Sequence, residues 1–157
     1  MSIEFVKGDL FASSLPAVAH GCNCAGAMGK GIAVMFKKKF PRMFEEYKIR
    51  CKEGLFLPGD VFTWQEDGLT VFNLGTQKSW RSKATIPAVK AAVEKMLTEA
   101  EKEGLDIIGL PRIGAGLGQL EWESVKDILT EASQDTPIRL MVFEEFVSGV
   151  PAQPQCV

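Results

Sequence analysis

The 157-residue sequence is poor in the side chains that build metal centres, because it contains one histidine, His20, and only four cysteines. Cys22 and Cys24 are separated by a single residue, which is not the spacing of a zinc ribbon. We therefore expect neither a bound metal nor a resident cofactor. The cysteines are interpreted as small buried thiols in a reducing compartment.

An excess of basic residues is also absent, because 18 lysines and arginines face 20 aspartates and glutamates, for a formal net charge of −2. Proteins that bind duplex nucleic acid are usually clearly basic, so the composition disfavours a polynucleotide partner. No secretion signal is visible, and no apolar run approaches the length of a membrane span. The sequence thus predicts a monomeric, cytoplasmic protein without a membrane partner.

The sequence does contain an alternation of strand and helix patterns. It predicts strands at 3–6, 17–22, 61–65, 69–74, 106–110 and 138–143, and helices at 32–40, 42–52, 86–103 and 122–133. The turn at 66–68 predicts an antiparallel hairpin, whereas strands elsewhere alternate with helices. We expect a three-layer α/β/α fold with a mixed, mostly parallel central sheet of about six strands. Residues 1–146 would form the single domain and 147–157 a flexible tail.

Glycine is concentrated in two segments that each lie between a predicted buried strand and a helix, "NCAGAMGKG" at 23–31 and "IGAGLG" at 113–118. A strand gains nothing from glycine at every second position, and a turn needs one or two. At neighbouring strand ends, two such loops could hold a diphosphate through backbone amides. Both loops are equally compatible with plain tight turns, because neither matches a known phosphate-binding fingerprint.

Three further positions are candidates for ligand contact. Asp9 follows the first strand and either accepts a hydrogen bond from an exocyclic amine or a ribose hydroxyl, or caps a turn. Asn23 follows a buried strand and either meets a sugar or a catalytic water, or is a turn residue. Phe143 ends the last strand and either stacks on a base or belongs to the core.

Five segments together resemble the macro domain, a family that binds ADP-ribose. They are "VKGDLF" (6–11), "HGCNCAGAMGKGIA" (20–33), "NLGTQK" (73–78), "LPRIGAGLG" (110–118) and "VF" (142–143). Each motif is weak alone, but five in the right order are a strong signal. The resemblance is closest to the branch of the terminal ADP-ribose protein glycohydrolase and the ADP-ribose 1''-phosphate processing proteins.

The resemblance implies a role for each matching position. Asp9 and the Leu10 amide would hydrogen-bond the adenine, and Phe143 would pack against it. The loop Gly114, Ala115, Gly116, Leu117 and Gly118 would wrap the diphosphate. The residues that would enclose the distal ribose or lie at the mouth of its pocket are Asn23, Met28, Gly29, Gly31, Ile32, Thr76 and Gln77.

The sequence departs from the branch at two catalytic positions. Where the glycohydrolase has a nucleophilic lysine this chain has Gln77, with Lys78 one residue later, and Gly118 replaces the catalytic aspartate. An amide cannot form a Schiff base and a glycine cannot take a proton. Three alternatives remain: Lys78 substitutes by a loop shift, a water positioned by Asn23 and the ligand's phosphate reacts, or there is no catalysis.

The resemblance therefore implies a protein that binds ADP-ribose and hydrolyses a group from C1'' of its distal ribose. The reaction would release phosphate from ADP-ribose 1''-phosphate, or remove an ADP-ribosyl unit from a protein or nucleic acid. Nucleic acid is expected only as such a modified substrate. The alternative is a module that reads ADP-ribose without turning it over, which the missing lysine and aspartate favour.

Overall fold

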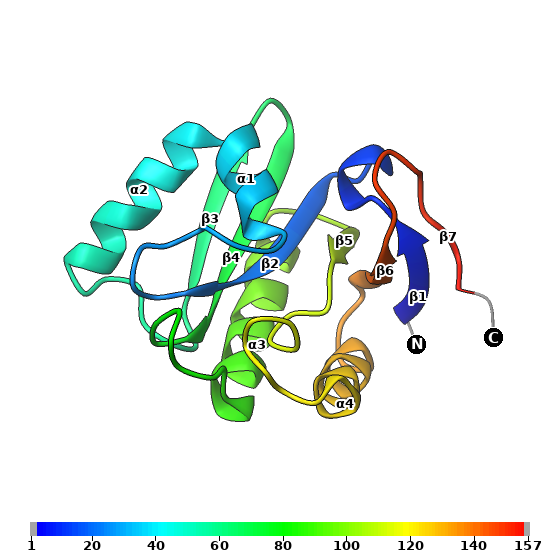
Figure 1. Ribbon diagram of the computed structural model, residues 1–157. Helices are drawn as coiled ribbons and strands as arrows, with labels where there is room; N and C mark the ends of the chain where they lie inside the picture. The colour runs from blue at the N-terminus through cyan, green and yellow to red at the C-terminus, as the bar shows by residue number, and fades with distance from the viewer. Residues whose placement is uncertain (1–2, 156–157) are drawn as a thin grey trace.

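The computed structural model of the protein describes residues 3–155. In these residues the strands are β1 (Ile3–Gly8), β2 (Ala17–Asn23), β3 (Val61–Glu66), β4 (Leu69–Gln77), β5 (Ile107–Leu110), β6 (Arg139–Phe146) and β7 (Gln153–Pro154). The helices are the short 3-10 turn η1 (Leu10–Ala12), α1 (Ala33–Lys39), α2 (Pro41–Lys52), α3 (Ile86–Lys102) and α4 (Trp122–Ser133). The strands form one sheet in the order β3-β4-β2-β5-β6-β1-β7 (Figure 1).

The sheet is mixed and mostly parallel, as the sequence predicts. β2 pairs in parallel with β4 and β5, and β6 pairs in parallel with β5 and β1. The hairpin at 66–68 is confirmed, because β3 runs antiparallel to β4 along the outer edge. Eight of the nine residues of β4 are buried, and four of these buried residues are polar: Thr70, Asn73, Thr76 and Gln77.

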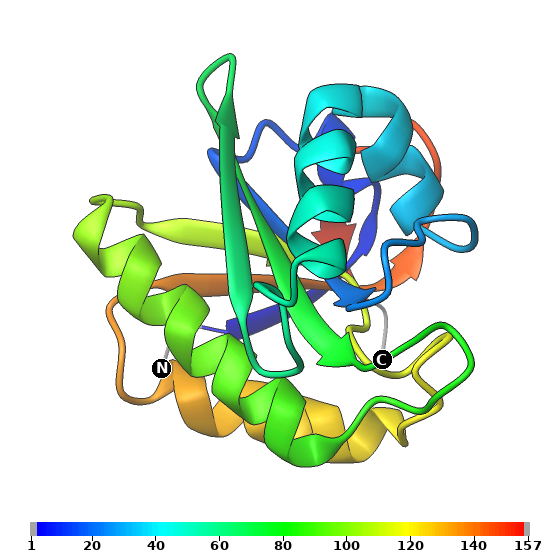
Figure 2. The same cartoon turned by 90° about the vertical axis from the view of Figure 1, so that its left-hand side faces the viewer.

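Helices cover both faces of the sheet, which gives the three layers (Figures 1 and 2). On one face α3 and α4 bury an aliphatic core around Val93, Met96 and Leu129. On the other face α1 and α2 bury an aromatic core that includes Phe36 and Tyr47, together with Val71 of β4. The Thr85 side chain caps α3 by accepting a hydrogen bond from the Ala88 N–H, so the preceding loop ends at a defined point.

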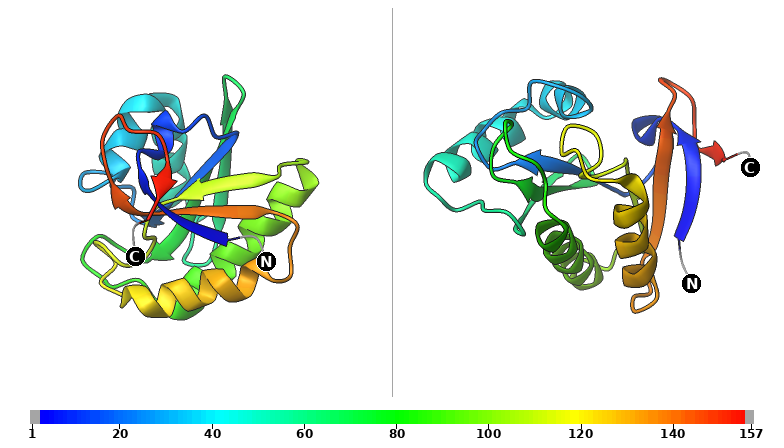
Figure 3. Two further views of the ribbon diagram at one scale, coloured as in Figure 1. Left: turned by 90° about the vertical axis from the view of Figure 1, so that its right-hand side faces the viewer. Right: turned by 60° about the horizontal axis from the view of Figure 1, so that its bottom comes forward.

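The C-terminal segment joins the sheet, which otherwise has the expected architecture. The sheet has seven strands where about six were expected, because residues 153–154 add β7 antiparallel to β1. Residues 147–155 are therefore not a free tail. The Asp9 N–H donates to the carbonyl oxygen of Val150 at 2.7 Å, and the Val147 N–H donates to that of Gly8 at 3.0 Å. The unsatisfied edge of β1 binds this segment, and a composition rich in proline and glycine does not reveal such pairing. Figure 3 shows β7 beside β1.

The loops that follow β2, β4 and β5 gather at one end of the molecule, as Figure 2 shows. They are residues 24–32, 78–85 and 111–121, and they lie between the two helical layers because each follows the carboxyl end of a central strand. No helix in the described part, residues 3–155, is both long and apolar enough to span a membrane.

Candidate functional site

Asn23 shapes the loop after β2 through its carboxamide. Its Oδ1 accepts hydrogen bonds from the Ala25 and Ala27 N–H groups at 3.0 and 3.3 Å, and its Nδ2 donates to the Ala27 carbonyl at 2.7 Å. The hydroxyl of Tyr47, on α2, donates to the Asn23 carbonyl oxygen at 2.8 Å and lies 3.0 Å from Oδ1. Asn23 thus holds the turn that follows β2, and ligand contact by its amide stays a prediction.

The three glycines of the loop after β5 serve three different purposes. Gly114 has a φ of +72°, which disfavours any side chain. A Cβ at Gly118 would lie 2.5 Å from the Gly114 oxygen and 2.8 Å from the Ala84 Cβ. A Cβ at Gly116 would meet no atom within 4 Å. Gly114 and Gly118 are therefore required by the fold, whereas Gly116 leaves its backbone open to an approaching ligand.

The loop after β4 is held in place by Gln77. Its Nε2 donates to the carbonyl oxygens of Ser79 and Ser82 at 3.0 and 2.8 Å, and the Ser79 N–H donates to the Ser82 Oγ at 2.8 Å. The loop then contacts the glycine loop, because the Ala84 N–H donates to the Gly118 carbonyl oxygen at 2.9 Å. Gln77 therefore organises a turn at the position where the related glycohydrolase carries its lysine.

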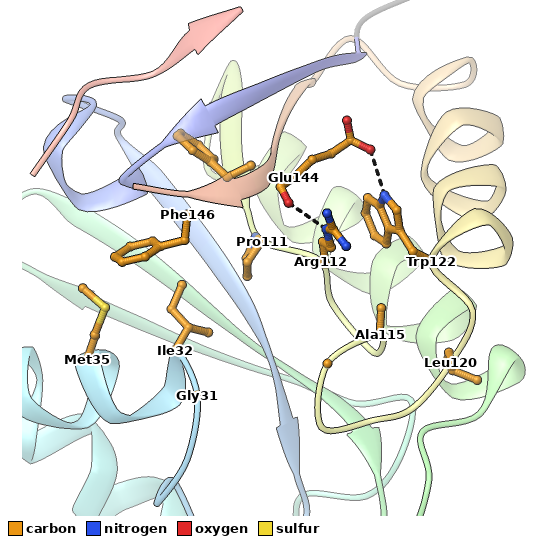
Figure 4. A pocket seen from close by; sticks show the side chains of 12 residues that line it. Gly31, Ile32, Met35, Pro111, Arg112, Ala115, Leu120, Trp122, Glu144 and Phe146 are labelled. Atoms are coloured by element: carbon orange, nitrogen blue, oxygen red, sulfur yellow. Dashed lines mark hydrogen bonds between the residues drawn. The ribbon is translucent and has the colours of Figure 1, made fainter. Parts of the chain in front are cut away.

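A first cavity, the α1–β6 cavity, has a volume of about 500 Å³ (Figure 4). Its apolar side is formed by Ile32, Met35 and Phe146, whose side chains face one another across the opening. The loop residues Ala115 and Gly116 form another part of the wall. An aromatic ring fits between such apolar side chains, while the loop backbone offers polar groups.

The opposite side of the α1–β6 cavity is polar and ordered. The Arg112 Nε donates to the Glu144 carbonyl oxygen at 2.7 Å, and the Trp122 Nε1 donates to the Glu144 carboxylate at 2.8 Å (Figure 4). Lys126 pairs with the same carboxylate at 3.1 Å. Although burial acts in the opposite direction, these hydrogen bonds hold the pKa of Glu144 below its usual range. The sequence analysis missed Met35, Arg112, Trp122 and Phe146.

A second cavity, the β2–β4 cavity, has a volume of about 360 Å³. Its described lining residues are Gly21, Cys22, Asn23, Ala27, Gly29, Lys30, Ala33, Gln77, Trp80 and Leu117. The Leu117 side chain extends over Gly31, where an added Cβ would lie 3.6 Å from its Cδ1. Since Gly31 lines the first cavity and Leu117 the second, the two cavities meet where these loops face each other.

Asp9 is 6 % exposed at the end of β1, and both of its carboxylate oxygens have protein partners. Oδ1 accepts from the Phe11 N–H at 2.9 Å, which caps η1, and Oδ2 accepts from the Gly149 N–H at 3.0 Å. Each carboxylate oxygen has a second acceptor position, so these bonds leave room for a ligand amine. The cap alternative for Asp9 is therefore present in the structure, and the adenine contact stays a prediction.

The structure separates the predicted site residues into two groups. Those that line one of the two cavities are Asn23, Gly29, Gly31, Ile32, Gln77, Ala115, Gly116, Leu117 and Phe143. Among described residues, Asp9, Leu10, Met28, Thr76, Lys78, Gly114 and Gly118 line neither. Met28 is 2 % exposed and belongs to the aromatic core, because its side chain turns inward from the loop. Lys78 is exposed to solvent outside both linings.

The loops around the site carry a net positive charge although the protein is slightly acidic. The three loops 24–32, 78–85 and 111–121 contain five basic residues, Lys30, Lys78, Arg81, Lys83 and Arg112, and one acidic residue, Glu121. This concentration of positive charge attracts anionic ligands to the loop end of the sheet.

The β2–β4 cavity offers little acid–base chemistry of its own. Cys22 and Lys30 are the ionisable side chains among its described lining residues. Burial raises the pKa of the Cys22 thiol well above its usual value, so the nucleophilic thiolate is suppressed. Of these two side chains, the Cys22 thiol is therefore unsuited to act as a nucleophile.

Comparison with known proteins agrees with this geometry. The macro domain family model matches residues 19–129. A DNA ADP-ribosyl glycohydrolase from Mycobacterium tuberculosis is 34% identical over 139 residues, which cover 86% of this chain and 40% of that protein. The chain thus spans less than half the length of that relative. Human ADP-ribose glycohydrolase OARD1 is 35% identical over 142 residues, which cover 90% of each protein.

Solved structures give the same result for the fold. The macrodomain of Mycobacterium tuberculosis DarG has a TM-score of 0.83 and 31% sequence identity, covering 90% of this chain and 96% of that one. The matched segment contains the two glycine loops and the strands that carry them. The chain belongs to the macro domain family.

Proposed function

We propose that this protein binds ADP-ribose and hydrolyses a group from C1'' of its distal ribose. The observation that carries the proposal is the pair of adjoining cavities. The first has an apolar slot and an open glycine backbone at Gly116, and the second holds the polar side chains of Asn23, Lys30 and Gln77 among apolar residues. The human relative named ADP-ribose glycohydrolase, which matches over 90% of both chains, supports it.

In this proposal the adenine occupies the apolar slot between Ile32, Met35 and Phe146. Ile32 is thus assigned to the adenine and not, as the resemblance implies, to the distal ribose. The diphosphate lies along the loop at Ala115 and Gly116, where no side chain blocks its approach. The distal ribose enters the β2–β4 cavity, where the free amide N–H of Asn23 can reach a hydroxyl. Phe143, which is 3 % exposed, forms the floor beneath the adenine.

The proposed reaction is addition of water to C1'' with cleavage of the bond to the leaving group. The water gives a proton to a phosphate oxygen of the ligand, and the same oxygen passes a proton to the leaving group, so that ADP-ribose and the protonated leaving group are the products. Gln77 has its Nε2 committed to the turn, so its Oε1 is the atom that can accept a hydrogen bond from that water. Such positioning is typically worth about 10²–10⁴-fold in rate.

The alternative, a reader without turnover, is distinguished by a direct assay. The protein is incubated with ADP-ribose 1''-phosphate, with an ADP-ribosylated peptide and with an ADP-ribosylated oligonucleotide, and release of ADP-ribose is followed by chromatography. Calorimetry with ADP-ribose measures binding in parallel. Turnover of at least one substrate is expected. Binding with no turnover would favour the reader, and absence of binding would reject both functions.

We further propose that the protein acts as a monomer in the cytoplasm on ADP-ribosylated substrates. Support comes from the single sheet with both faces covered by helices of the same chain. Sedimentation velocity of the purified chain tests the monomeric state, and fractionation of cells that express it tests the location.

A further inference from the structure

Residues 147–155, here called the C-terminal strap, fold back over the carboxyl end of β1 (Figures 1 and 3). The last part of the strap contains β7, which pairs with β1. The first part contacts Asp9 twice. The Asp9 N–H donates to the Val150 carbonyl oxygen at 2.7 Å, and the Gly149 N–H donates to the Asp9 Oδ2 at 3.0 Å. The strap therefore binds both the backbone and the side chain of Asp9.

The contact with the Asp9 carboxylate goes beyond what covering a sheet edge requires. An edge is covered by pairing of backbone groups, which β7 provides. The Gly149 N–H instead donates to a side chain. Gly149 has a φ of +74°, which favours glycine, and the Val150 N–H closes the turn by donating to the Val147 carbonyl oxygen at 3.2 Å. The N–H is thus presented by a turn with its own hydrogen bond and its own glycine.

The chain on both sides of Asp9 is fitted to the strap. Gly8 has a φ of +137°, and a Cβ there would lie 2.8 Å from the Val150 oxygen and 2.9 Å from the Pro151 oxygen. Further along, the Ser13 Oγ accepts a hydrogen bond from the Ala152 N–H at 3.0 Å. The close approach of the strap therefore depends on a missing side chain at Gly8 and on a hydroxyl at Ser13.

The two protein hydrogen bonds to the Asp9 carboxylate come from distant parts of the chain. Oδ1 accepts from the Phe11 N–H at 2.9 Å, two residues later, and Oδ2 accepts from the Gly149 N–H, 140 residues later. The local bond alone leaves the carboxylate free to turn, whereas the bond from the strap fixes its plane. A fixed acceptor discriminates between ligands more strongly, because it cannot turn away from a group that fails to donate.

We propose that the C-terminal strap is a specificity element of the adenine site, in which Gly149 acts through Asp9 to make the site prefer a 6-aminopurine over a 6-oxopurine. The inference rests on the proposed function and on the predicted hydrogen bond from the adenine amine to Asp9. Phe146, which borders the adenine slot, is the register partner of Gly8, so Asp9 directly follows the strand position beside the slot. An amine donates to the fixed carboxylate, whereas an oxo group would face it with a second acceptor. Gly149 is thus a positioning residue.

The test measures, by calorimetry, the Kd of ADP-ribose and of inosine diphosphate ribose, in which an oxo group replaces the adenine amine. The full chain is compared with Gly149→Pro, which has no N–H to donate, and with Gly149→Asn, which keeps the N–H and tolerates a positive φ. A side chain at Gly149 meets no atom within 4 Å, so neither variant creates an overlap with the protein. Both substitutions are also made in the Asp9→Ala background, and urea unfolding checks that every variant is folded.

Loss of a hydrogen bond to a charged acceptor typically lowers affinity about 10- to 150-fold. We expect wild type and Gly149→Asn to prefer ADP-ribose by a factor in that range. Gly149→Pro should reduce the preference to less than about fivefold, mainly through weaker binding of ADP-ribose. In the Asp9→Ala background, Gly149→Pro should leave the ratio of the two Kd values unchanged. Equal weakening of both ligands by Gly149→Pro, or a wild-type preference in that variant, would overturn the inference.

Binding separates this inference from the proposed hydrolysis. Neither ligand carries a group to be removed from C1'', so calorimetry measures recognition of the base whether or not the protein is an enzyme. If the wild-type chain turns over no substrate, the proposed function fails, but the strap still predicts the preference for ADP-ribose and its loss in Gly149→Pro. Equal affinity of the wild-type chain for the two ligands would overturn the strap's role even if hydrolysis is observed.

Discussion

The backbone N–H of Ala84 donates a hydrogen bond to the carbonyl oxygen of Gly118 at 2.9 Å, and the methyl group of Ala84 fills the space where a Gly118 side chain would begin. This contact closes the loop after β4 onto the loop after β5. The position at which the related glycohydrolase carries an aspartate is thus occupied here by packing between two loops.

An aspartate introduced at position 118 should therefore destabilise the protein, because its side chain would overlap atoms of the two loops. We expect Gly118→Ala to lower the free energy of unfolding by about 1–3 kcal/mol, because its Cβ would overlap the Gly114 oxygen, and Gly118→Asp by at least as much. Urea unfolding measures the change. Gly116→Ala is the matched control and should stay within about 0.5 kcal/mol. Wild-type stability of Gly118→Asp would contradict the packing argument.

Gly116 is the position where a side chain should block the ligand and spare the fold. A Cβ there meets no atom within 4 Å, so Gly116→Val should unfold like the wild type, while its methyl groups occupy the space that the diphosphate needs. Calorimetry should show affinity for ADP-ribose reduced at least about 100-fold, with Gly116→Ala intermediate. Normal binding by the valine variant would show that this glycine serves only the turn.

Asp9→Ala should weaken ADP-ribose binding by about 1.5–3 kcal/mol if the carboxylate accepts a hydrogen bond from the adenine amine. The variant also removes the partner of the Gly149 N–H, so the C-terminal segment needs a control. Ser13→Ala provides it, because the Ser13 Oγ accepts from the Ala152 N–H at 3.0 Å and does not touch the carboxylate. Equal losses in the two variants would assign the effect to the segment and not to adenine.

No lysine should be linked covalently to the substrate during turnover. Lys78 is exposed outside the cavity linings, so Lys78→Ala should keep any activity largely intact, whereas Asn23→Ala should reduce it by disordering the loop after β2. Borohydride trapping with an ADP-ribosylated substrate, followed by mass spectrometry, checks this directly. An adduct on Lys78, or on Lys30 at the cavity wall, would establish a covalent mechanism.

His20 should make stability depend on pH between about 6.5 and 4. Its ring is fully buried and stacked on Phe36 at 3.7 Å, and burial lowers its pKa from 6.5 to about 4, although the hydrogen bond to Asn73 acts in the opposite direction. Below pH 6.5 His20 is protonated in the unfolded chain but stays neutral in the folded protein until the pH nears 4. The free energy of unfolding therefore decreases as the pH falls through this range. A shift of this size corresponds to about 3 kcal/mol.

The His20 effect is isolated by comparison with His20→Gln, because carboxylates titrate in the same range. As the pH is lowered from 7 to 4, the wild-type protein should lose more unfolding free energy than the His20→Gln variant does. A constant difference across that range would show that His20 titrates in the folded protein as it does in the unfolded one.

Much of the fold could be predicted from local pattern. The hairpin at 66–68, the buried run of β4 and the amphipathic α3 each follow from turn residues and periodicity within one segment. β7 could not, because Gln153 and Pro154 pair with β1 only when that edge is open to them. Pairing between distant segments depends on which edge strand of the sheet is still unpaired, and local composition does not indicate this.

The sequence by itself determined the family, the glycine loops and the loss of the lysine and aspartate, since these are identities at positions along one chain. Only the tertiary structure decided what each of those residues does. Gln77 holds a turn, Gly118 makes room for Ala84, and Met28 turns into the core. Arg112, Phe146 and Trp80 became site residues only when loops from separate strands met. The physical reason is that a side chain's role follows from its neighbours in space, and folding brings those neighbours together from remote parts of the chain.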